Sequence, residues 1–177
     1  MLRQGRITSA QTRAFFDLWP RFGLAIEHLK QGPIDLSQAF FGRAGPVFLE
    51  IGFGNGDTLL ALAARYPERN FLGIEVHRPG VGHLLLELER QGLNNVRVIQ
   101  EDAVRVLDWG LPPSCVAGVY LFFPDPWHKA RHHKRRLVTP AFAESLSRVM
   151  VDGGTLWLAT DWQDYAQQMR EVFAVAP

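Results

Sequence analysis

Five short apolar runs alternate with segments of helical periodicity, and this alternation restricts the fold more than any other feature of the chain. The runs are residues 47–51, 71–76, 96–99, 116–123 and 155–159, each bounded by Gly, Pro, Asn or Asp. Runs that are apolar at nearly every position are typical of parallel strands with both faces covered. The pattern therefore predicts a doubly wound, mostly parallel α/β sheet of the Rossmann-like kind.

Helix signals between these runs agree with crossover connections. Residues 57–66 and 80–90 are expected to be helical, and Thr139 followed by Pro140 predicts the start of a later helix. That helix is expected to end at the glycine pair 153–154, before the fifth strand. A last helix is predicted after Asp161, and the residues expected to face the sheet are Trp162, Tyr165, Met169 and Phe173.

The chain is expected to form a single domain with an N-terminal appendage. Its 177 residues, 47% of them hydrophobic, suffice for one core without disulfides or metal. Residues 1–40 precede the first strand and contain one predicted helix, residues 10–19, which Ser9 would cap and Pro20 would stop. Residues 41–177 would form the sheet domain, against which the appendage packs.

Cysteine usage and the length of the apolar stretches favour a reducing compartment. Cys115 is the only cysteine, so it cannot form an internal disulfide, and it is expected to be a small buried residue rather than a nucleophile. The first residues lack the apolar core of a signal peptide, and no apolar stretch reaches membrane-spanning length. We therefore expect a cytoplasmic protein.

A glycine-rich turn, EIGFGNG, follows the first run at residues 50–56. Gly52, Gly54 and Gly56 let the backbone turn tightly and approach a ligand closely, because no Cβ intrudes. Asp57 stands where a dinucleotide fingerprint has its third glycine, and an acid at a helix N-terminus repels a pyrophosphate. The loop therefore favours a ligand without phosphates, such as S-adenosylmethionine (SAM), which carries a sulfonium, an ammonium, a ribose and an adenine.

Three acidic residues stand at the ends of successive predicted strands, namely Glu50, Glu75 and Asp102. Because the carboxyl ends of parallel strands meet at one edge of the sheet, we expect these residues to share a site. Glu75 can accept hydrogen bonds from both ribose hydroxyls, an arrangement that would also suit NAD. Glu50 would lie near the methionine ammonium, and Asp102 would take the adenine amino group. Taken singly, each is better explained as an exposed strand-end carboxylate, and it is the combination with the glycine loop that favours a shared site.

A basic run follows the fourth predicted strand. Residues 124–127 (PDPW) lead directly into residues 128–136 (HKARHHKRR), with no acid between Asp125 and Glu144. The whole chain has 19 Lys and Arg against 18 Asp and Glu, so its basicity is local. A carboxylate, an indole and several cations together predict a site for a nucleic-acid base and its phosphate backbone, the alternative being a solvated charged face. Trp127 would either stack on a base or fill the core.

The six histidines do not predict a metal site. His128 and His132 are four residues apart, but their segment reads as a loop without a defined ligand shell. They are expected to add conditional positive charge beside RNA. His28, His77 and His83 are expected to be structural or surface residues.

Several longer motifs stand along the chain: Arg3-x-Gly5-Arg6, residues 18–24 (LWPRFGL), 50–56, 73–75 (GIE), 124–129 (PDPWHK), 134–136 (KRR) and 159–162 (ATDW). Together they resemble the bacterial tRNA (guanine-N7-)-methyltransferase family, which implies a Rossmann-like, SAM-dependent methyltransferase fold. The glycine loop is common to many methyltransferases. The sequence P-D-P-W-x-K followed by basic residues is far more specific.

By position, this resemblance implies a role for each candidate site residue. SAM would be bound by Glu50, Gly52, Gly54, Gly56, Glu75 and Asp102, and Asp125 would be the central acidic residue of the active site. Lys129 and Asp161 would contact the substrate. RNA would be contacted by Arg131, Lys134, Arg135 and Arg136. The implied reaction is methyl transfer to N7 of a guanine in the tRNA variable loop.

The chemistry of that reaction makes positioning more important than base strength. Guanine N7 carries an in-plane lone pair and needs no deprotonation, so the protein must mainly hold N7, the methyl carbon and the sulfur in line. Asp125 would accept hydrogen bonds from guanine N1 and N2 and stabilise the growing positive charge. The alternative is that Asp125 takes the N1 proton as a general base.

The family continues through two more strands and a T-x-x-E substrate motif after the position of Pro177, so the sheet of this chain is expected to lack those two strands. Three functional classes stay open: an active tRNA methyltransferase, a noncatalytic tRNA- or partner-binding module with the same fold, and a different Rossmann enzyme that uses a small substrate or NAD. Asp57 argues against NAD and the basic run argues against a small substrate. Monomer and homodimer remain open.

Overall fold

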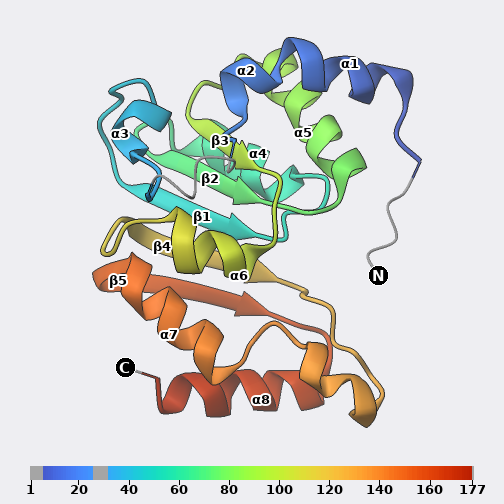
Figure 1. The fold of residues 1–177 in the computed structure, drawn as a ribbon, viewed down its shortest axis with the longest axis vertical. Coiled ribbons are helices and arrows are strands. Elements are labelled where there is room, and N and C mark those ends of the chain that lie inside the picture. Colours follow the sequence, from blue (N-terminus) through green and yellow to red (C-terminus); the bar gives the residue numbers. More distant parts are fainter. Residues whose placement is uncertain (1–5, 26–31, 177) are drawn as a thin grey trace.

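A computed structural model describes residues 6–25 and 32–176, and it contains a five-stranded sheet with helices on both faces (Figure 1). The strands are β1 (Val47–Ile51), β2 (Asn70–Ile74), β3 (Val96–Ile99), β4 (Val116–Phe122) and β5 (Met150–Ala159). Their order across the sheet is β3-β2-β1-β4-β5, and every neighbouring pair is parallel. The predicted doubly wound α/β fold is confirmed. Arg3, Gly5 and His28, which the sequence singled out, lie outside the described residues.

The helices are α1 (Ser9–Asp17), α2 (Trp19–Phe22), α3 (Leu36–Ala39), α4 (Asp57–Arg65), α5 (Arg78–Gln91), α6 (Ala103–Arg105), α7 (Pro140–Val149) and α8 (Gln163–Ala174). A π-helical turn, Val106–Gly110, continues α6, and a 3₁₀ helix, Ala130–Arg135, precedes α7. One core cluster includes side chains of α1, α4 and α5, and the other includes side chains of α7 and α8. In Figure 1 the first group lies at the upper end and α7 and α8 lie at the lower end.

The chain reverses its crossover direction around β1, which pairs with β2 on one side and with β4 on the other. Ile51 is opposite Ile74 in β2 and opposite Leu121 in β4, so these three strands end nearly level. In an open α/β sheet, the loops that leave such a point diverge and leave a crevice at the carboxyl edge. The fold therefore brings the three loops that follow β1, β2 and β4 to one edge.

The cap of the N-terminal helix lies one residue before the expected one. Thr8 is the N-cap of α1: its hydroxyl accepts the Gln11 amide, and the Gln11 side chain accepts the Thr8 amide, which completes a capping box. Pro20 does not stop helical structure. It lies in the first turn of α2, where its missing N–H needs no partner. The prediction that Ser9 caps and Pro20 stops this helix was wrong.

The start of β5 was also predicted wrongly. The amphipathic helix α7 ends at Val149 and the chain enters the strand at once, so that Met150 pairs with Val116. The ladder is then irregular until Thr155 pairs with Gly118, and Gly153 adopts a φ of 74° within the irregular stretch. The glycine pair therefore marks a bulge in the strand rather than the end of a helix.

Helix α8 packs against the sheet with Tyr165, Met169 and Val172. Trp162, expected on that face, is instead the N-cap residue and is 38% exposed. The other predicted helices have nearly the expected bounds, and the Thr139 hydroxyl accepts the Phe142 amide as an N-cap. Within residues 6–25 and 32–176, no helix is both long and apolar enough to cross a membrane.

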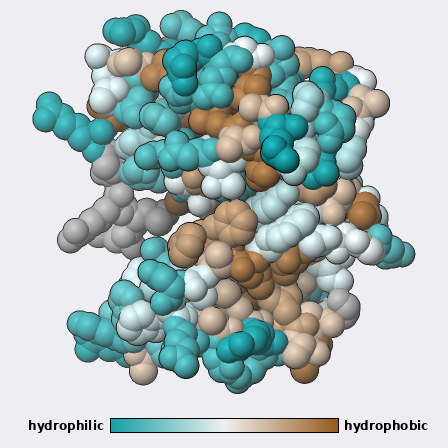
Figure 2. Space-filling view, turned by 180° about the vertical axis from the view of Figure 1, so that it is seen from behind, coloured by the Kyte–Doolittle hydropathy of each residue, from teal (hydrophilic) through white to brown (hydrophobic). Residues whose placement is uncertain are grey.

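The face opposite the view of Figure 1 is shown in Figure 2. Hydrophilic residues dominate its upper part, and apolar residues reach the surface in its middle. On the same side of the sheet as Phe48, Tyr120 stacks on Trp157 with ring centroids 4.6 Å apart. Trp157 is among the exposed large hydrophobic residues. The β4–β5 half of the sheet is therefore aromatic on the side that carries Phe48.

Candidate active site

A cavity of about 430 Å³ opens at the carboxyl edge of β1, β2 and β4. Its apolar wall includes the strand-end residues Ile51, Ile74 and Leu121. Its volume is within the range of small-molecule binding sites. Six of the residues predicted from the sequence line it together: Gly52, Glu75, Asp102, Asp125, Trp127 and Arg135.

The glycine loop between β1 and α4 has a left-handed backbone at each predicted glycine. The φ angles of Gly52, Gly54 and Gly56 are 72°, 59° and 87°. Gly56 is the N-cap of α4, and a Cβ at this position would lie 2.7 Å from the Leu84 side chain. Glycine is therefore required at residue 56 both by its φ angle and by its close approach to α5.

Glu75 ties the end of β2 to the glycine loop. One carboxylate oxygen accepts the Gly54 amide at 2.8 Å, and the other accepts the amides of Val76 and His77 at 2.7 and 2.8 Å. The residue is buried, yet it lines the cavity. Three backbone donors fix the carboxylate at the cavity wall.

Glu50 is placed differently from the other two strand-end acids. It is 4% exposed, it does not line the cavity, and among the described residues its Oε2 has no hydrogen-bond partner. Side chains alternate along a strand, so Glu50 shares the sheet face of Phe48. Burial, and to a lesser degree the nearby Glu75 carboxylate, raise the pKa of Glu50 to about 7.

Asp102 and its neighbour Glu101 form an acidic corner of the cavity. Asp102 is exposed and caps α6, because its Oδ1 accepts the amides of Val104 and Arg105 at 2.9 and 3.4 Å. Glu101 accepts the Asp102 amide with one oxygen and pairs with Arg105 at 3.0 Å through the other. The sequence reasoning passed over Glu101, although two consecutive acids at a strand end were a usable signal.

The loop after β4 holds Asp125 in a constrained backbone. Phe123 and Trp127, on either side of residues 124–126, have φ angles of 51° and 46°. Non-glycine residues rarely adopt this region, and such strain clusters at functional sites. Phe123 lines the cavity and is 66% exposed, and its amide donates to the Ala159 carbonyl at 2.8 Å. The strand was predicted to include Phe123, so its role as part of the cavity wall was missed.

The basic run forms a 3₁₀ helix, Ala130–Arg135, and not the loop expected from its composition. Lys129, Arg131, Lys134 and Arg135 are exposed. The Arg135 guanidinium lies 5.0 Å from the centroid of the Trp127 ring, and both residues line the cavity. Lys129, Arg131 and Lys134 lie outside the cavity lining, as does the exposed Asp161.

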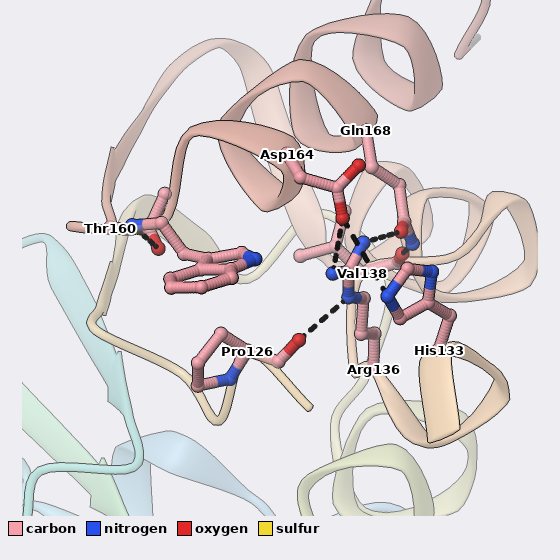
Figure 3. A network of polar contacts seen from close by, with 8 residues as sticks. Pro126, His133, Arg136, Val138, Thr160, Asp164 and Gln168 are labelled. Carbon is pink, nitrogen blue, oxygen red and sulfur yellow. Dashed lines mark hydrogen bonds and ion pairs between the residues drawn. The ribbon is translucent and has the colours of Figure 1, made fainter. Parts of the chain in front are cut away.

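Arg136 differs from the rest of the basic run because its side chain is only 1% exposed. Figure 3 shows its guanidinium between the Pro126 carbonyl and the side chains of Asp164 and Gln168 on α8. The sequence grouped Arg136 with the RNA-contacting cations, but in this structure it is directed inward and does not reach the surface. Its burial could not be seen in the sequence, because Arg136 directly follows two other cationic residues, Lys134 and Arg135.

The Cys115 thiol and the candidate metal-binding side chains were also considered from the sequence. Burial raises the pKa of Cys115 to about 11, so this thiol is protonated at neutral pH. In the part of the chain that the structure describes, no group of three or more His, Cys, Asp or Glu side chains could hold a metal ion. His128 instead contacts Trp162, with ring centroids 4.2 Å apart.

Solved structures with similar folds include methyltransferases. The 16S rRNA methyltransferase KamB aligns with a TM-score of 0.60 at 14% identity, over 81% of this chain and 74% of that one. Precorrin-6y C5,15-methyltransferase from Geobacter metallireducens aligns with a TM-score of 0.59 at 17% identity, over 75% of this chain and 62% of that one. At these identities the likeness shows the Rossmann-like fold of SAM-dependent methyltransferases.

Comparison of sequences is more specific. A family described as putative methyltransferase matches residues 44–177. The tRNA (guanine-N(7)-)-methyltransferase of Alkalilimnicola ehrlichii is 54% identical over 99% of this chain and 73% of its own length. The enzymes of the same name from Nitrosococcus oceani and Xanthomonas oryzae are also 54% identical, over 97% and 100% of this chain and 71% and 69% of their own lengths. This chain belongs to the tRNA (guanine-N(7)-)-methyltransferase family.

Proposed function

We propose that the protein transfers the methyl group of SAM to N7 of a guanine in tRNA, giving N7-methylguanosine, and that the target lies in the variable loop. The observation that carries the proposal is that one cavity is lined both by Gly52, Glu75 and Asp102 and by Asp125, Trp127 and Arg135. A cofactor site and a nucleic-acid site therefore adjoin.

The residues at the ends of β1, β2 and β3 fit the groups of SAM. Both capping hydrogen bonds of Asp102 are accepted by Oδ1, so we assign Oδ2 as the acceptor of a hydrogen bond from the adenine amino group. Glu50 lies behind the cavity lining, and its buried Oε2 has no partner among the described residues, which fits a cation such as the methionine ammonium. We assign the ribose to the Glu75 side of the cavity, and the backbone of Gly52, Gly54 and Gly56 to close contact with the cofactor.

When bound, SAM supplies the methyl group that the guanine N7 lone pair attacks as the bond from carbon to sulfur breaks. The protein then has to orient the purine and to balance the positive charge that the purine gains. Asp125 can do both by accepting hydrogen bonds from guanine N1–H and N2–H. Alternatively, Asp125 acts as a general base and takes the guanine N1 proton after methyl transfer.

The surrounding residues support the base and its phosphates. Trp127 offers an aromatic face at the cavity wall, and Arg135 lies beside that ring. Arg131, Lys134 and Lys129 are exposed cations on or next to the 3₁₀ helix, and we assign them to phosphate contacts. Asp161, two residues after β5, is assigned to the substrate side.

The packing of α1 and α2 on the sheet domain supports the division into an appendage, residues 1–40, and a methyltransferase domain, residues 41–177.

A methyl-transfer assay on tRNA that lacks N7-methylguanosine tests the proposal. Labelled methyl from SAM should enter tRNA at one guanine, which chemical cleavage locates, and Asp125→Asn should slow transfer by about 100-fold or more because the amide carries no charge. Asp17→Asn, an exposed acid on α1, is the matched control and should retain activity.

Other outcomes distinguish the alternatives. Binding of both SAM and tRNA without any transfer would favour the noncatalytic binding module. A melting temperature that rises with NAD and not with SAM would reject the proposal, since a ligand stabilises the fold that binds it. The tRNA substrate and the single Cys115 agree with the expected cytoplasmic location.

A further inference from the structure

Arg136 is buried, unlike the exposed Lys and Arg residues of the 128–136 run, and each of its three guanidinium nitrogens donates a hydrogen bond within the described part of the protein. Its Nε donates to the Pro126 carbonyl at 2.8 Å, its Nη1 to Gln168 Oε1 at 2.7 Å, and its Nη2 to Asp164 Oδ2 at 2.6 Å. The guanidinium also lies 4.8 Å from the centroid of the Tyr165 ring. These contacts join the loop that carries Asp125 to helix α8 (Figure 3).

The loop itself offers few backbone donors for holding it in place. Pro124 and Pro126 have no amide hydrogen, so the backbone around Asp125 lacks two donors. Both flanking residues, Phe123 and Trp127, have positive φ angles that the surrounding structure must maintain. The carbonyl of Pro126, which accepts the Arg136 bond, is one residue from Asp125 and adjoins Trp127.

The α8 side of the contact is itself fixed. The Val138 amide donates to the Tyr165 hydroxyl at 3.1 Å, and the Val138 carbonyl accepts from Gln168 Nε2 at 2.9 Å. Tyr165 is fully buried in the core. Arg136 is thus held between a rigid helix and a strained loop, and moving its guanidinium to a phosphate would break three hydrogen bonds at once.

We infer that Arg136 is a positioning residue, which holds Asp125 and Trp127 at the cavity through the Pro126 carbonyl and is anchored by Asp164 and Gln168, and that it does not contact RNA phosphates. This inference rests on the proposed function. In support, the hydrogen bond from Arg136 lowers the pKa of Asp164, so the anchor stays ionised well below neutral pH.

Kinetics separates positioning from phosphate binding. In Arg136→Lys, which keeps the charge but cannot make the same three bonds, kcat should fall by about 10- to 100-fold while KM for tRNA and the salt dependence of tRNA binding stay unchanged. In Arg131→Ala, the exposed cation, KM for tRNA should rise and the salt slope should fall by about one. Arg170→Ala, an exposed arginine on α8, is the control and should alter neither.

Asp164→Asn tests how Arg136 is anchored, because it removes the charge of the acceptor and leaves every Lys and Arg residue in place. Asp164 is 60% exposed, so this change should leave the fold intact, yet it should lower kcat in the same direction as Arg136→Lys. The double variant should lower kcat by a smaller factor than the product of the two separate factors, because both substitutions act on the same contact. Hydrogen exchange of the segment 125–130 should be faster in both variants, with the protection of β1 unchanged.

Three results would overturn the inference. One is a raised KM and a shallower salt slope in Arg136→Lys at unchanged kcat, which would make Arg136 a phosphate contact. Another is wild-type kcat and wild-type exchange in folded Asp164→Asn. The third is unchanged exchange of residues 125–130 in a folded Arg136→Lys. If the wild-type protein transfers no methyl group, the proposed function fails, whereas the exchange measurement still decides whether Arg136 holds the loop.

Discussion

Glu50 is buried with an oxygen that no described residue satisfies, and its ionisation opposes folding in the absence of a ligand. Its pKa is raised to about 7 in the folded state, against 4.5 for the ordinary carboxyl. Between these values the folded protein keeps a proton that the unfolded chain loses, so stability falls as pH rises through this window. Above it, the full cost is on the order of 3 kcal/mol.

Glu50→Gln should therefore make the SAM-free protein more stable at pH 8 and leave it nearly unchanged at pH 5. If Glu50 pairs with the methionine ammonium, SAM binding should show the opposite trend: wild-type affinity should increase as pH rises through about 7, whereas the Gln variant should bind weakly at every pH. Urea unfolding and calorimetric SAM titration at both pH values measure the two effects. Glu144→Gln, an exposed acid on α7, should change neither, and a Gln variant no more stable at pH 8 would contradict the argument.

The glycine loop depends on helix α5 as much as on its own residues. A Cβ at Gly80, in the first turn of α5, would lie 2.0 Å from the Gly54 carbonyl oxygen, so Gly80→Ala must push the helix and the loop apart. We expect this variant to lose SAM affinity by about 10-fold or more.

Gly82→Ala, two residues further along the same helix, is the matched control for this prediction. Its Cβ would meet the Gln11 side chain of α1 at 2.8 Å, away from the glycine loop. It should lower the melting temperature and keep SAM affinity. Equal SAM affinities for the two variants, measured by titration, would show that the contact between α5 and the loop is unimportant for the cofactor.

The elements that sequence predicted well are those whose signals are local. Apolar runs set β1 and β3 to the residue, and Thr139 with Pro140 set the start of α7. The errors arose where distant partners decide the outcome. Arg136 reads as one more cation of a basic run, because its acceptors on α8 are 28 and 32 residues further along the chain. Phe123 reads as strand, because nothing local shows that its backbone turns to positive φ.

The protein as a whole carries a net charge of only +1, so its attraction for tRNA must come from the placement of its cations and not from their number. Arg135→Glu and Arg170→Glu change the net charge equally, from +1 to −1, since each replaces a positive by a negative charge. Arg135 lines the cavity beside Trp127, whereas Arg170 lies on the exposed side of α8. If local charge governs binding, Arg135→Glu should weaken tRNA binding at low salt and reduce the slope of log K against log salt concentration by about one or more. Arg170→Glu should leave both the affinity and the slope unchanged. Binding measured over a series of salt concentrations separates the two variants; equal losses would mean that the field of the whole molecule, and not the edge of the cavity, attracts the RNA.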